Sequence, residues 1–297
     1  MQFHPSNALP ISWNEVTPRL PVNLPGQGFK DFSFTDVSHL FGPIIPGELE
    51  FEGRVFGQLH RKREWLGWFA VIVYLLGIYW GQRWMANRQP FKLKHSLAGW
   101  NLLLAVFSLV GTIRLLPYFV YVAWTNGFTY FICRASTVSY AHGPVGLWVM
   151  LFIWSKFAEL LDTVFLVLRK KPVNLLHWFH HATVLLYCWY AGMFETPTGI
   201  FFALMNFAVH TVMYGYYFLA AIGTPPKWGR MVTVMQISQM VAGIVINSAH
   251  FWLGRTVPHC NCQTNVMIAA TLMYGAYLAL FLDFFIKRYL NSKAKAD

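Results

Sequence analysis

The sequence predicts an all-α polytopic membrane protein that crosses the bilayer seven times. Of its 297 residues, 56% are hydrophobic and only 12% are charged, against roughly 25% charged residues in soluble domains. So few charges could not cover a soluble globule of this size, and seven apolar runs are each long enough to span a bilayer. Together these observations exclude a soluble enzyme, an intrinsically disordered chain and a disulfide-rich scaffold.

The seven predicted spans follow a segment that is rich in Pro and Gly. Residues 1–60 lack clear hydrophobic periodicity, and we expect them to form an irregular extramembrane N-terminal segment. The seven-helix transmembrane domain then occupies residues 61–290, and a cytosolic tail occupies residues 291–297. The spans are expected at residues 65–82, 96–122 (with Pro117 allowing a kink), 143–168, 174–192, 199–222, 231–254 and 265–285.

Positive charge predicts the orientation of these spans. The 1–2, 3–4 and 5–6 connections and the tail hold four, three, two and four Lys and Arg residues, whereas the other connections hold only Arg114, Arg134 and Arg255. Because cytoplasmic loops carry the excess of Lys and Arg, we expect a cytosolic C-terminus. The basic residues 61–63 disagree with this orientation. The net charge of +11 is divided among short clusters rather than gathered in one stripe, so no nucleic-acid partner is expected.

Polar side chains recur at helical spacing within four of the predicted spans. Such groups are costly inside a bilayer and usually mark function. Span four places His177, His180 and His181 on one helix face. The other stripes are Lys156, Glu159, Asp162 and Thr163 in span three, Asn206, His210, Tyr214 and Tyr217 in span five, and Thr233, Gln236, Gln239 and Asn247 in span six. An internal ion pair could account for the span-three stripe, and interhelical hydrogen bonds for the span-six stripe. All four stripes are satisfied together only around a shared, partly wet cavity, which we predict to be the functional site.

Imidazole groups allow several kinds of chemistry at such a site. They serve as general bases, nucleophiles or metal ligands, and the His-x-x-His-His spacing resembles the boxes of iron-dependent membrane desaturases and hydroxylases. Those enzymes have about eight histidines in three boxes, whereas only His210 and His250 add intramembrane imidazoles here. The sequence therefore has too few histidine ligands for a di-iron site, and no metal is expected. A seven-helix transporter or receptor is the other alternative, and the lack of an internal repeat weakens it.

Four motifs resemble the ELO family of very-long-chain fatty-acid elongases in order and spacing. They are K-F-A-E-L-L-D-T at 156–163, H-W-F-H-H at 177–181, N-F-A-V-H-T-V-M-Y-G-Y-Y at 206–217 and T-V-M-Q-I-S-Q at 233–239. The resemblance covers roughly residues 90–290. Leu160, where the family often has Lys, and Trp178 within the histidine box are similar to the branch that acts on saturated and monounsaturated acyl chains.

This resemblance implies a fold and a reaction. Spans two to seven would form a barrel around an acyl tunnel that opens to the cytosol. The reaction would be the condensing step of elongation, in which acyl-CoA and malonyl-CoA give 3-oxoacyl-CoA, CO2 and CoA without a cofactor. The partners implied are these two substrates, the lipid bilayer, and the reductases and dehydratase of the elongation cycle, while homo-oligomerisation is left open.

Among the polar residues, we expect an imidazole, first of all His180, to attack the acyl thioester and form an acyl-histidine. His210 and Tyr214 would manage protons and the developing oxyanion, and general-base action of His180 in a ternary complex is the alternative. Cys188 lies about 10 Å deeper than His181, beside the expected acyl tail, and is read as a buried hydrophobe. The full set comprises the catalytic candidates His177, His180, His181, His210 and Tyr214, and the supporting residues Lys156, Glu159, Asp162, Asn206, Tyr217, Gln236 and Gln239.

Three further expectations concern the loops and the tail. CoA phosphates would meet the basic connections at Arg169, Lys170, Lys171, Lys227 and Arg230, although positive-inside topology explains these charges equally well. Lys293 and Lys295 resemble a dilysine retrieval signal and predict residence in the endoplasmic reticulum. Cys133, in the 2–3 connection, is expected to pair with Cys260 or Cys262, in the 6–7 connection, in the oxidising lumen; free thiols are the alternative.

Overall fold

The computed structural model describes residues 42–43, 45–194 and 196–291. Residues 1–41 and the two lysines of the expected retrieval signal, Lys293 and Lys295, therefore lie outside the described residues. Within the described part the regular elements are helices, with an isolated antiparallel bridge between Glu52 and His142. The all-helical fold class predicted from the sequence is confirmed for this part of the chain.

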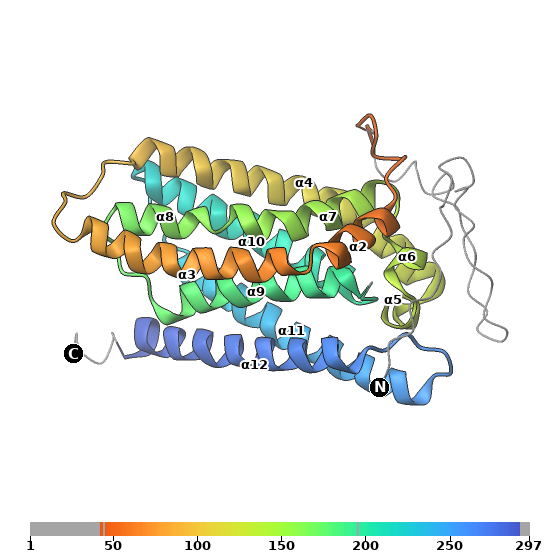
Figure 1. Ribbon diagram of the computed structural model, residues 1–297. Helices are drawn as coiled ribbons and strands as arrows, with labels where there is room; N and C mark the ends of the chain where they lie inside the picture. Colours follow the sequence, from red (N-terminus) through yellow and green to blue (C-terminus); the bar gives the residue numbers. More distant parts are fainter. Residues whose placement is uncertain (1–41, 44, 195, 292–297) are drawn as a thin grey trace, which may run out of the picture.

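The long helices run roughly along one common axis, with connections at both ends (Figure 1). We call the end at which α12 finishes the tail end, and the opposite end, which carries α5 and α6, the hairpin end. The elements are α2 (Gly53–Lys62), α3 (Trp65–Met85), α4 (Lys94–Asn126), α5 (Phe128–Cys133), α6 (Ser136–Ser139), α7 (Gly143–Ala158), α8 (Leu161–Leu168), α9 (Leu175–Met193), α10 (Gly199–Ile222), α11 (Gly229–Thr256), α12 (Thr264–Phe285) and the π-helix η2 (Ile286–Leu290).

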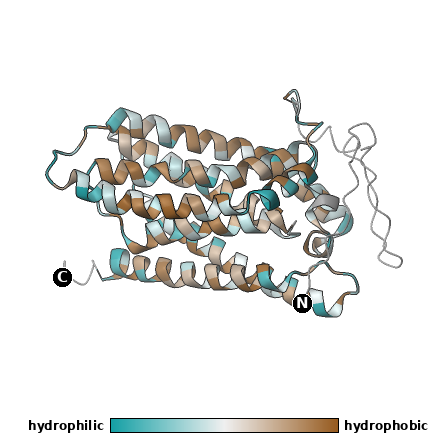
Figure 2. Cartoon of the chain, viewed as in Figure 1, coloured by the Kyte–Doolittle hydropathy of each residue, from teal (hydrophilic) through white to brown (hydrophobic). Residues whose placement is uncertain are grey.

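Within the described residues, five helical segments have the length and apolar composition needed to cross a membrane. They are α3, α4, α10, α11 and the continuous segment formed by α12 and η2. The pair α7–α8 and the histidine-bearing helix α9 lie alongside them (Figure 1). Hydrophobic residues recur along the long helices (Figure 2), and among them α3 exposes Trp68, Ile72 and Trp80. This surface is suited to contact with lipid.

Two expectations about local structure are wrong. A single helix was expected over residues 143–168, but the chain turns at Glu159 and Leu160, where i→i+3 hydrogen bonds replace the α-helical pattern. Helix α2 covers residues 53–62, most of which were assigned to the irregular N-terminal segment. Its buried residues are Gly57 and His60 rather than large apolar side chains, so its inward face gives no hydrophobic periodicity.

Side-chain size sets how closely the long helices approach one another. Helix α4 packs against α7 and α10, α7 against α9, α9 against α12, and α11 against both α10 and α12. At the α4–α10 contact, a Cβ on Gly111 would lie 2.6 Å from the ring of Phe207, so glycine is required for this spacing. Helix α7 also contacts α10, so each of these six helices contacts at least two others of the group, while α3 packs on α8 and α9.

The segment before α3 is fixed to the hairpin end by buried polar contacts. Glu48 is fully buried, pairs with Arg114 at 3.1 Å and accepts a hydrogen bond from Trp148 Nε1 at 3.0 Å. His60 in α2 packs with its ring centroid 4.2 Å from that of Trp189 in α9. Burial lowers the pKa of His60 to about 4, so this imidazole is neutral near pH 7 and packs as an apolar ring.

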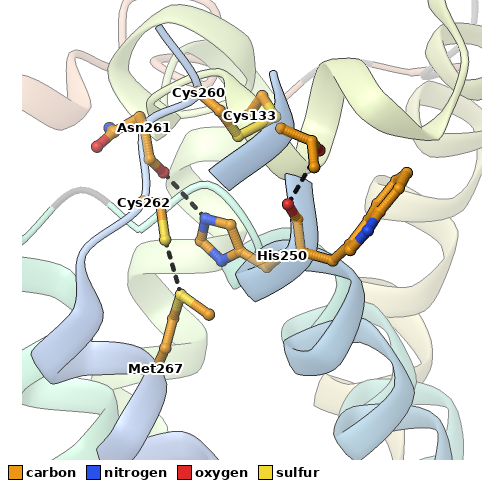
Figure 3. Close-up of a disulfide and its surroundings, with 8 residues drawn as sticks. Cys133, His250, Cys260, Asn261, Cys262 and Met267 are labelled. Atoms are coloured by element: carbon orange, nitrogen blue, oxygen red, sulfur yellow. Dashed lines mark hydrogen bonds between the residues drawn. A yellow bond between two sulfur atoms is a disulfide. The ribbon is translucent and has the colours of Figure 1, made fainter. Parts of the chain in front are cut away.

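A disulfide closes the hairpin end (Figure 3). It joins Cys133, the last residue of α5, to Cys260 in the connection between α11 and α12, across 127 residues of sequence. Asn261 N also donates to the carbonyl oxygen of Cys133, and the carbonyl of Asn261 lies 3.0 Å from His250 Nε2. Cys262 is free and its Sγ lies 3.0 Å from Met267 Sδ. The two connections are therefore held by a covalent bond and by main-chain hydrogen bonds.

We predict that Cys260→Ser lowers the melting temperature of the purified protein by roughly 5–10 °C, because a disulfide typically contributes about 2–4 kcal/mol to stability. Cys262→Ser is the matched control, since the Cys262 thiol forms no disulfide, and its melting temperature should match that of the wild type. Intact-mass measurement after alkylation, with and without reductant, checks the bond itself. Alkylation of Cys133 in the unreduced wild type, or equal melting temperatures for the two variants, would contradict the prediction.

Candidate active site

The helices enclose a cavity of about 630 Å³ that reaches their tail end. Its deep wall includes the histidine box of α9 and the polar row of α10, and its open end includes Arg169, Gly229 and Tyr289. The residues predicted from the sequence that line it are Glu159, Asp162, His177, His180, His181, Asn206, His210, Tyr214, Tyr217, Thr233, Gln236 and Gln239. Four helical segments thus direct their polar stripes into one space.

Lys156 lies behind this wall and is only 2% exposed. Its Nζ donates to Glu159 Oε1 at 2.6 Å and to Asn206 Oδ1 at 3.0 Å, and it sits 4.3 Å from the centroid of the Phe152 ring. Ser155 Oγ also donates to Glu159 Oε1, at 3.1 Å. The ion pair expected as an alternative for span three is therefore present, and it is hydrogen-bonded to the α10 row that borders the cavity.

The same network orients His210. Because Asn206 Oδ1 accepts from Lys156, its Nδ2 is the atom that donates to His210 Nε2, at 3.0 Å. A neutral His210 therefore carries its proton on Nδ1, which lies 3.8 Å from Glu159 Oε1. Both ring nitrogens of His210 thus face protein groups, and the carboxylate is placed to stabilise a positive charge on this imidazole.

Asp162 is held by two aromatic donors from different helices. Trp100 Nε1 of α4 donates to Oδ1 at 2.6 Å, and the Tyr214 hydroxyl of α10 donates to Oδ2 at 2.7 Å. The short turn at Glu159 and Leu160 allows both Glu159 and Asp162 to reach the cavity. Tyr217 lies further out along α10 and is 45% exposed, so it borders the open part of the cavity rather than its depth.

The histidine box begins at a capped helix end. The Asn174 side chain accepts a hydrogen bond from the backbone N–H of His177, which fixes the first turn of α9. His177 Nε2 lies 2.8 Å from Thr163 Oγ1, and the rings of His177 and His181 are 4.4 Å apart. The ring of His180 packs 4.9 Å from that of Tyr277 in α12. The Tyr277 hydroxyl donates to the carbonyl oxygen of His180 at 3.2 Å.

The remaining residues predicted from the sequence divide into those at the cavity and those away from it. Arg169 borders its open end, but the Lys170 ammonium donates to the backbone carbonyls of Ala86 and Arg88 instead. The Arg230 guanidinium stacks over Phe285. Lys171 and Lys227 are exposed in the connections. Cys188 is buried outside this cavity, in the wall of a smaller apolar pocket of about 100 Å³ towards the hairpin end.

Sequence reasoning missed three contributors to the site: Trp100, Tyr277 and Arg288. Trp100 and Tyr277 are aromatic residues in apolar helices, where nothing in the sequence distinguishes a hydrogen-bonding ring from a packing one. Arg288 is in η2 and lines the open end of the cavity. In the sequence it was counted only as one of the positive charges of the cytosolic tail.

Within the described residues, no group of three or more His, Cys, Asp or Glu side chains is arranged to hold a metal ion.

The cavity combines imidazole rings, a buried carboxylate network and phenol hydroxyls, and apolar residues such as Leu97, Met240 and Phe281 also line it. Clusters of this kind suit acyl transfer, which needs a nucleophile or base together with donors for a developing oxyanion. The apolar side would accommodate a hydrocarbon chain.

Comparison with known proteins agrees with this arrangement. Residues 61–297 match the model of the ELO (GNS1/SUR4) family. The chain is 38% identical to very long chain fatty acid elongase 6 of Gallus gallus, over 84% of this chain and 95% of that protein. It is 39% identical to the Homo sapiens protein of the same name, over 75% and 84% of the two chains. The Drosophila melanogaster protein of that name is 38% identical, over 81% and 78%. Because the family model covers most of the chain and these relatives are at least 38% identical to it, this chain belongs to the ELO family.

Proposed function

We propose a membrane arrangement and a mechanism for the reaction that this chain catalyses, the condensation of acyl-CoA with malonyl-CoA in fatty-acid elongation. The products are 3-oxoacyl-CoA, CO2 and CoA. The reaction involves no net oxidation or reduction, and decarboxylation of malonyl-CoA supplies the carbon nucleophile. We therefore propose that it requires neither a metal nor an organic cofactor. The residues that would carry the chemistry all border the cavity described above.

In the proposed arrangement the chain crosses the bilayer seven times. Helix α3 and the six helices that contact one another in a closed order would each span it, with α7 and α8 together forming one span. The six would form a barrel around the cavity, and α3 would lie outside. The basic connections and η2 lie together at the tail end, which supports a cytosolic C-terminus and entry of both CoA substrates there (Figure 1).

The nucleophile in this proposal is the imidazole of His180. One observation carries this choice: among the described residues, the structure records no hydrogen bond to the ring of His180, although the ring borders the cavity. By contrast, Asn206 and Glu159 flank the nitrogens of His210, and Thr163 contacts His177. His181 is 7% exposed, so its ring is less accessible than that of His180. A nucleophile needs a free lone pair that can reach the substrate.

The reaction would then proceed in two stages. A ring nitrogen of His180 attacks the thioester carbonyl, the C–S bond breaks, and CoA leaves after its sulfur takes up a proton. Malonyl-CoA next loses CO2, and the resulting enolate carbon attacks the acyl-imidazole. The C–N bond breaks, which frees His180 and releases 3-oxoacyl-CoA. His210, backed by Glu159, would exchange protons with the substrates once its Nε2 releases Asn206. Tyr214 would stabilise the oxyanion once its hydroxyl turns from Asp162 to the substrate.

The acyl tail would extend from His180 towards the hairpin end. Phe202 and Tyr274 pack in the apolar cluster on this side, and the smaller pocket beside Cys188 lies beyond it. From His180 to Gly192, near the end of α9, the helix rises about 18 Å. A fully extended chain of roughly fourteen to sixteen carbons would fit this depth. We therefore propose saturated or monounsaturated acyl-CoA of about this length as the substrate.

Incubation of the enzyme with palmitoyl-CoA alone should release about one equivalent of CoA and add the acyl mass to the peptide that contains His180. His180→Ala should abolish both this burst and the condensation product. Cys188→Ser is the control and should retain most of the activity, because the Cys188 thiol lies outside the cavity. Release of CoA only when malonyl-CoA is also present would overturn the covalent scheme in favour of a ternary complex with His180 as the general base.

We also propose that the enzyme resides in the endoplasmic reticulum through Lys293 and Lys295 of the cytosolic tail. Replacing both lysines with Ser should move part of the protein to later compartments, as measured by acquisition of Golgi-type glycans on an appended lumenal reporter. Lys287→Ser is a matched control, because Lys287 is a tail-end cation further from the C-terminus that pairs with Asp283. An unchanged distribution of the double variant would remove support for this retrieval signal.

A further inference from the structure

Helix α3 contributes one polar group to the interior of the protein. Most of its large side chains are exposed, but Val71 and Tyr74 are each only 7% exposed and face α8 and α9. A Cβ on Gly67 would lie 3.0 Å from Trp189 of α9, so the two helices are in close contact on this side. The Tyr74 hydroxyl is thus brought to the back of the histidine box.

A continuous chain of hydrogen bonds runs from this hydroxyl to the site. Tyr74 Oη lies 2.9 Å from Thr163 Oγ1 of α8, and Thr163 Oγ1 lies 2.8 Å from His177 Nε2 of α9. Thr163 is 2% exposed, so these bonds are sheltered from water. Three helices meet in this relay, and its last member, His177, borders the cavity.

The number of protons available determines the direction of the relay. Thr163 has one hydroxyl proton, which it can give either to Tyr74 or to His177. If it donated to Tyr74, the phenol proton would have no acceptor among the described residues, which is costly for a buried group. If Tyr74 donates to Thr163 and Thr163 donates to His177 Nε2, every proton in the relay is used. A neutral His177 then carries its own proton on Nδ1.

We propose that Tyr74 is a positioning residue that, through Thr163, holds His177 in the Nδ1–H form and so supplies the cavity with a hydrogen-bond donor. This inference rests on the proposed function, because the donor acts there on the thioester or the malonyl carboxylate. It also gives α3, which lies outside the six-helix group, a part in the reaction. The histidine box then contains two kinds of imidazole: His180 with a free ring, and His177 with a fixed proton.

The test begins with Tyr74→Phe, which keeps the ring and removes the phenol proton. Without that donor, Thr163 can accept a proton from His177 Nε2, and the Nδ1–H form is no longer favoured. Measured with palmitoyl-CoA and radiolabelled malonyl-CoA, kcat should fall roughly 3–10-fold, as expected for the loss of one hydrogen bond. KM should change less than twofold. Tyr79→Phe is the matched control, because Tyr79 is on the same helix and is 49% exposed; it should behave as the wild type.

Changes at Thr163 separate the relay from simple packing. Thr163→Ser retains a hydroxyl and should retain most of kcat, whereas Thr163→Val should lose about as much as Tyr74→Phe. The double variant Tyr74→Phe/Thr163→Val should lose no more than either single variant, because both break the same chain. Multiplied losses in the double variant, or wild-type kcat in Tyr74→Phe, would overturn the inference.

A spectroscopic measurement tests the tautomer directly. In wild-type protein with 15N-labelled histidine, the His177 ring, assigned by comparison with His177→Gln, should show its proton on Nδ1. In Tyr74→Phe the proton should move towards Nε2, with no shift of comparable size in Tyr79→Phe. A proton on Nε2 in the wild type would refute the relay. Failure of the proposed function would look different: the wild-type enzyme would form no condensation product while its His177 tautomer remained as described.

Discussion

In the hydrocarbon region of a bilayer, a charged or hydrogen-bonding side chain cannot be solvated by water, so its hydrogen bonds must be made within the protein. Among the described residues, Lys156 is a deeply buried example, and in the proposed arrangement its helix α7 is part of a span. Its ammonium is buried between Glu159 and Asn206, and it can be accommodated only if α7 and α10 face each other at hydrogen-bond distance. An uncompensated cation at the centre of a bilayer would cost about 2.5–3.5 kcal/mol or more. The relative placement of these helices, and hence the cavity they border, depends on this pair.

The same contacts explain why the third predicted span is broken rather than continuous. At Glu159 and Leu160 the chain tightens into i→i+3 hydrogen bonds, and the carboxylates before and after the turn serve different helices. Glu159 belongs to the lysine network, while Asp162 receives hydrogen bonds from Trp100 and Tyr214. A short turn thus connects two separate groups of polar residues, and the α-helical hydrogen-bond pattern is interrupted at this turn.

Two kinds of feature could be predicted from the sequence: residues that repeat at helical spacing, and polar residues whose burial in an apolar segment costs free energy. Polar residues repeated at helical spacing in apolar runs indicated the stripes. The structure places those of α9 and α10 along one cavity, together with Thr233, Gln236 and Gln239 of α11, whereas Asn247 is buried outside its lining. Features that depend on a single contact could not be found in this way. In the sequence, Trp100 and Tyr277 cannot be distinguished from aromatic residues that only pack. Helix α2 was not predicted because its buried residues, Gly57 and His60, give no apolar periodicity. Lys170 resembled a phosphate ligand, yet its ammonium closes a loop by contacting backbone carbonyls.

The bond between Cys133 and Cys260 also constrains the order in which the protein is built. The second cysteine is synthesised 127 residues after the first, so at about 5–20 residues per second the two are separated by roughly 6–25 s of translation. Throughout that interval, while α7 to α11 are made, Cys133 cannot form its bond to Cys260. The crosslink can therefore join only a bundle whose core helices already exist, with α12 added last. Oxidation of this pair is therefore a late step in biogenesis, and a chain that ends before residue 260 keeps the thiol of Cys133 and lacks the crosslink.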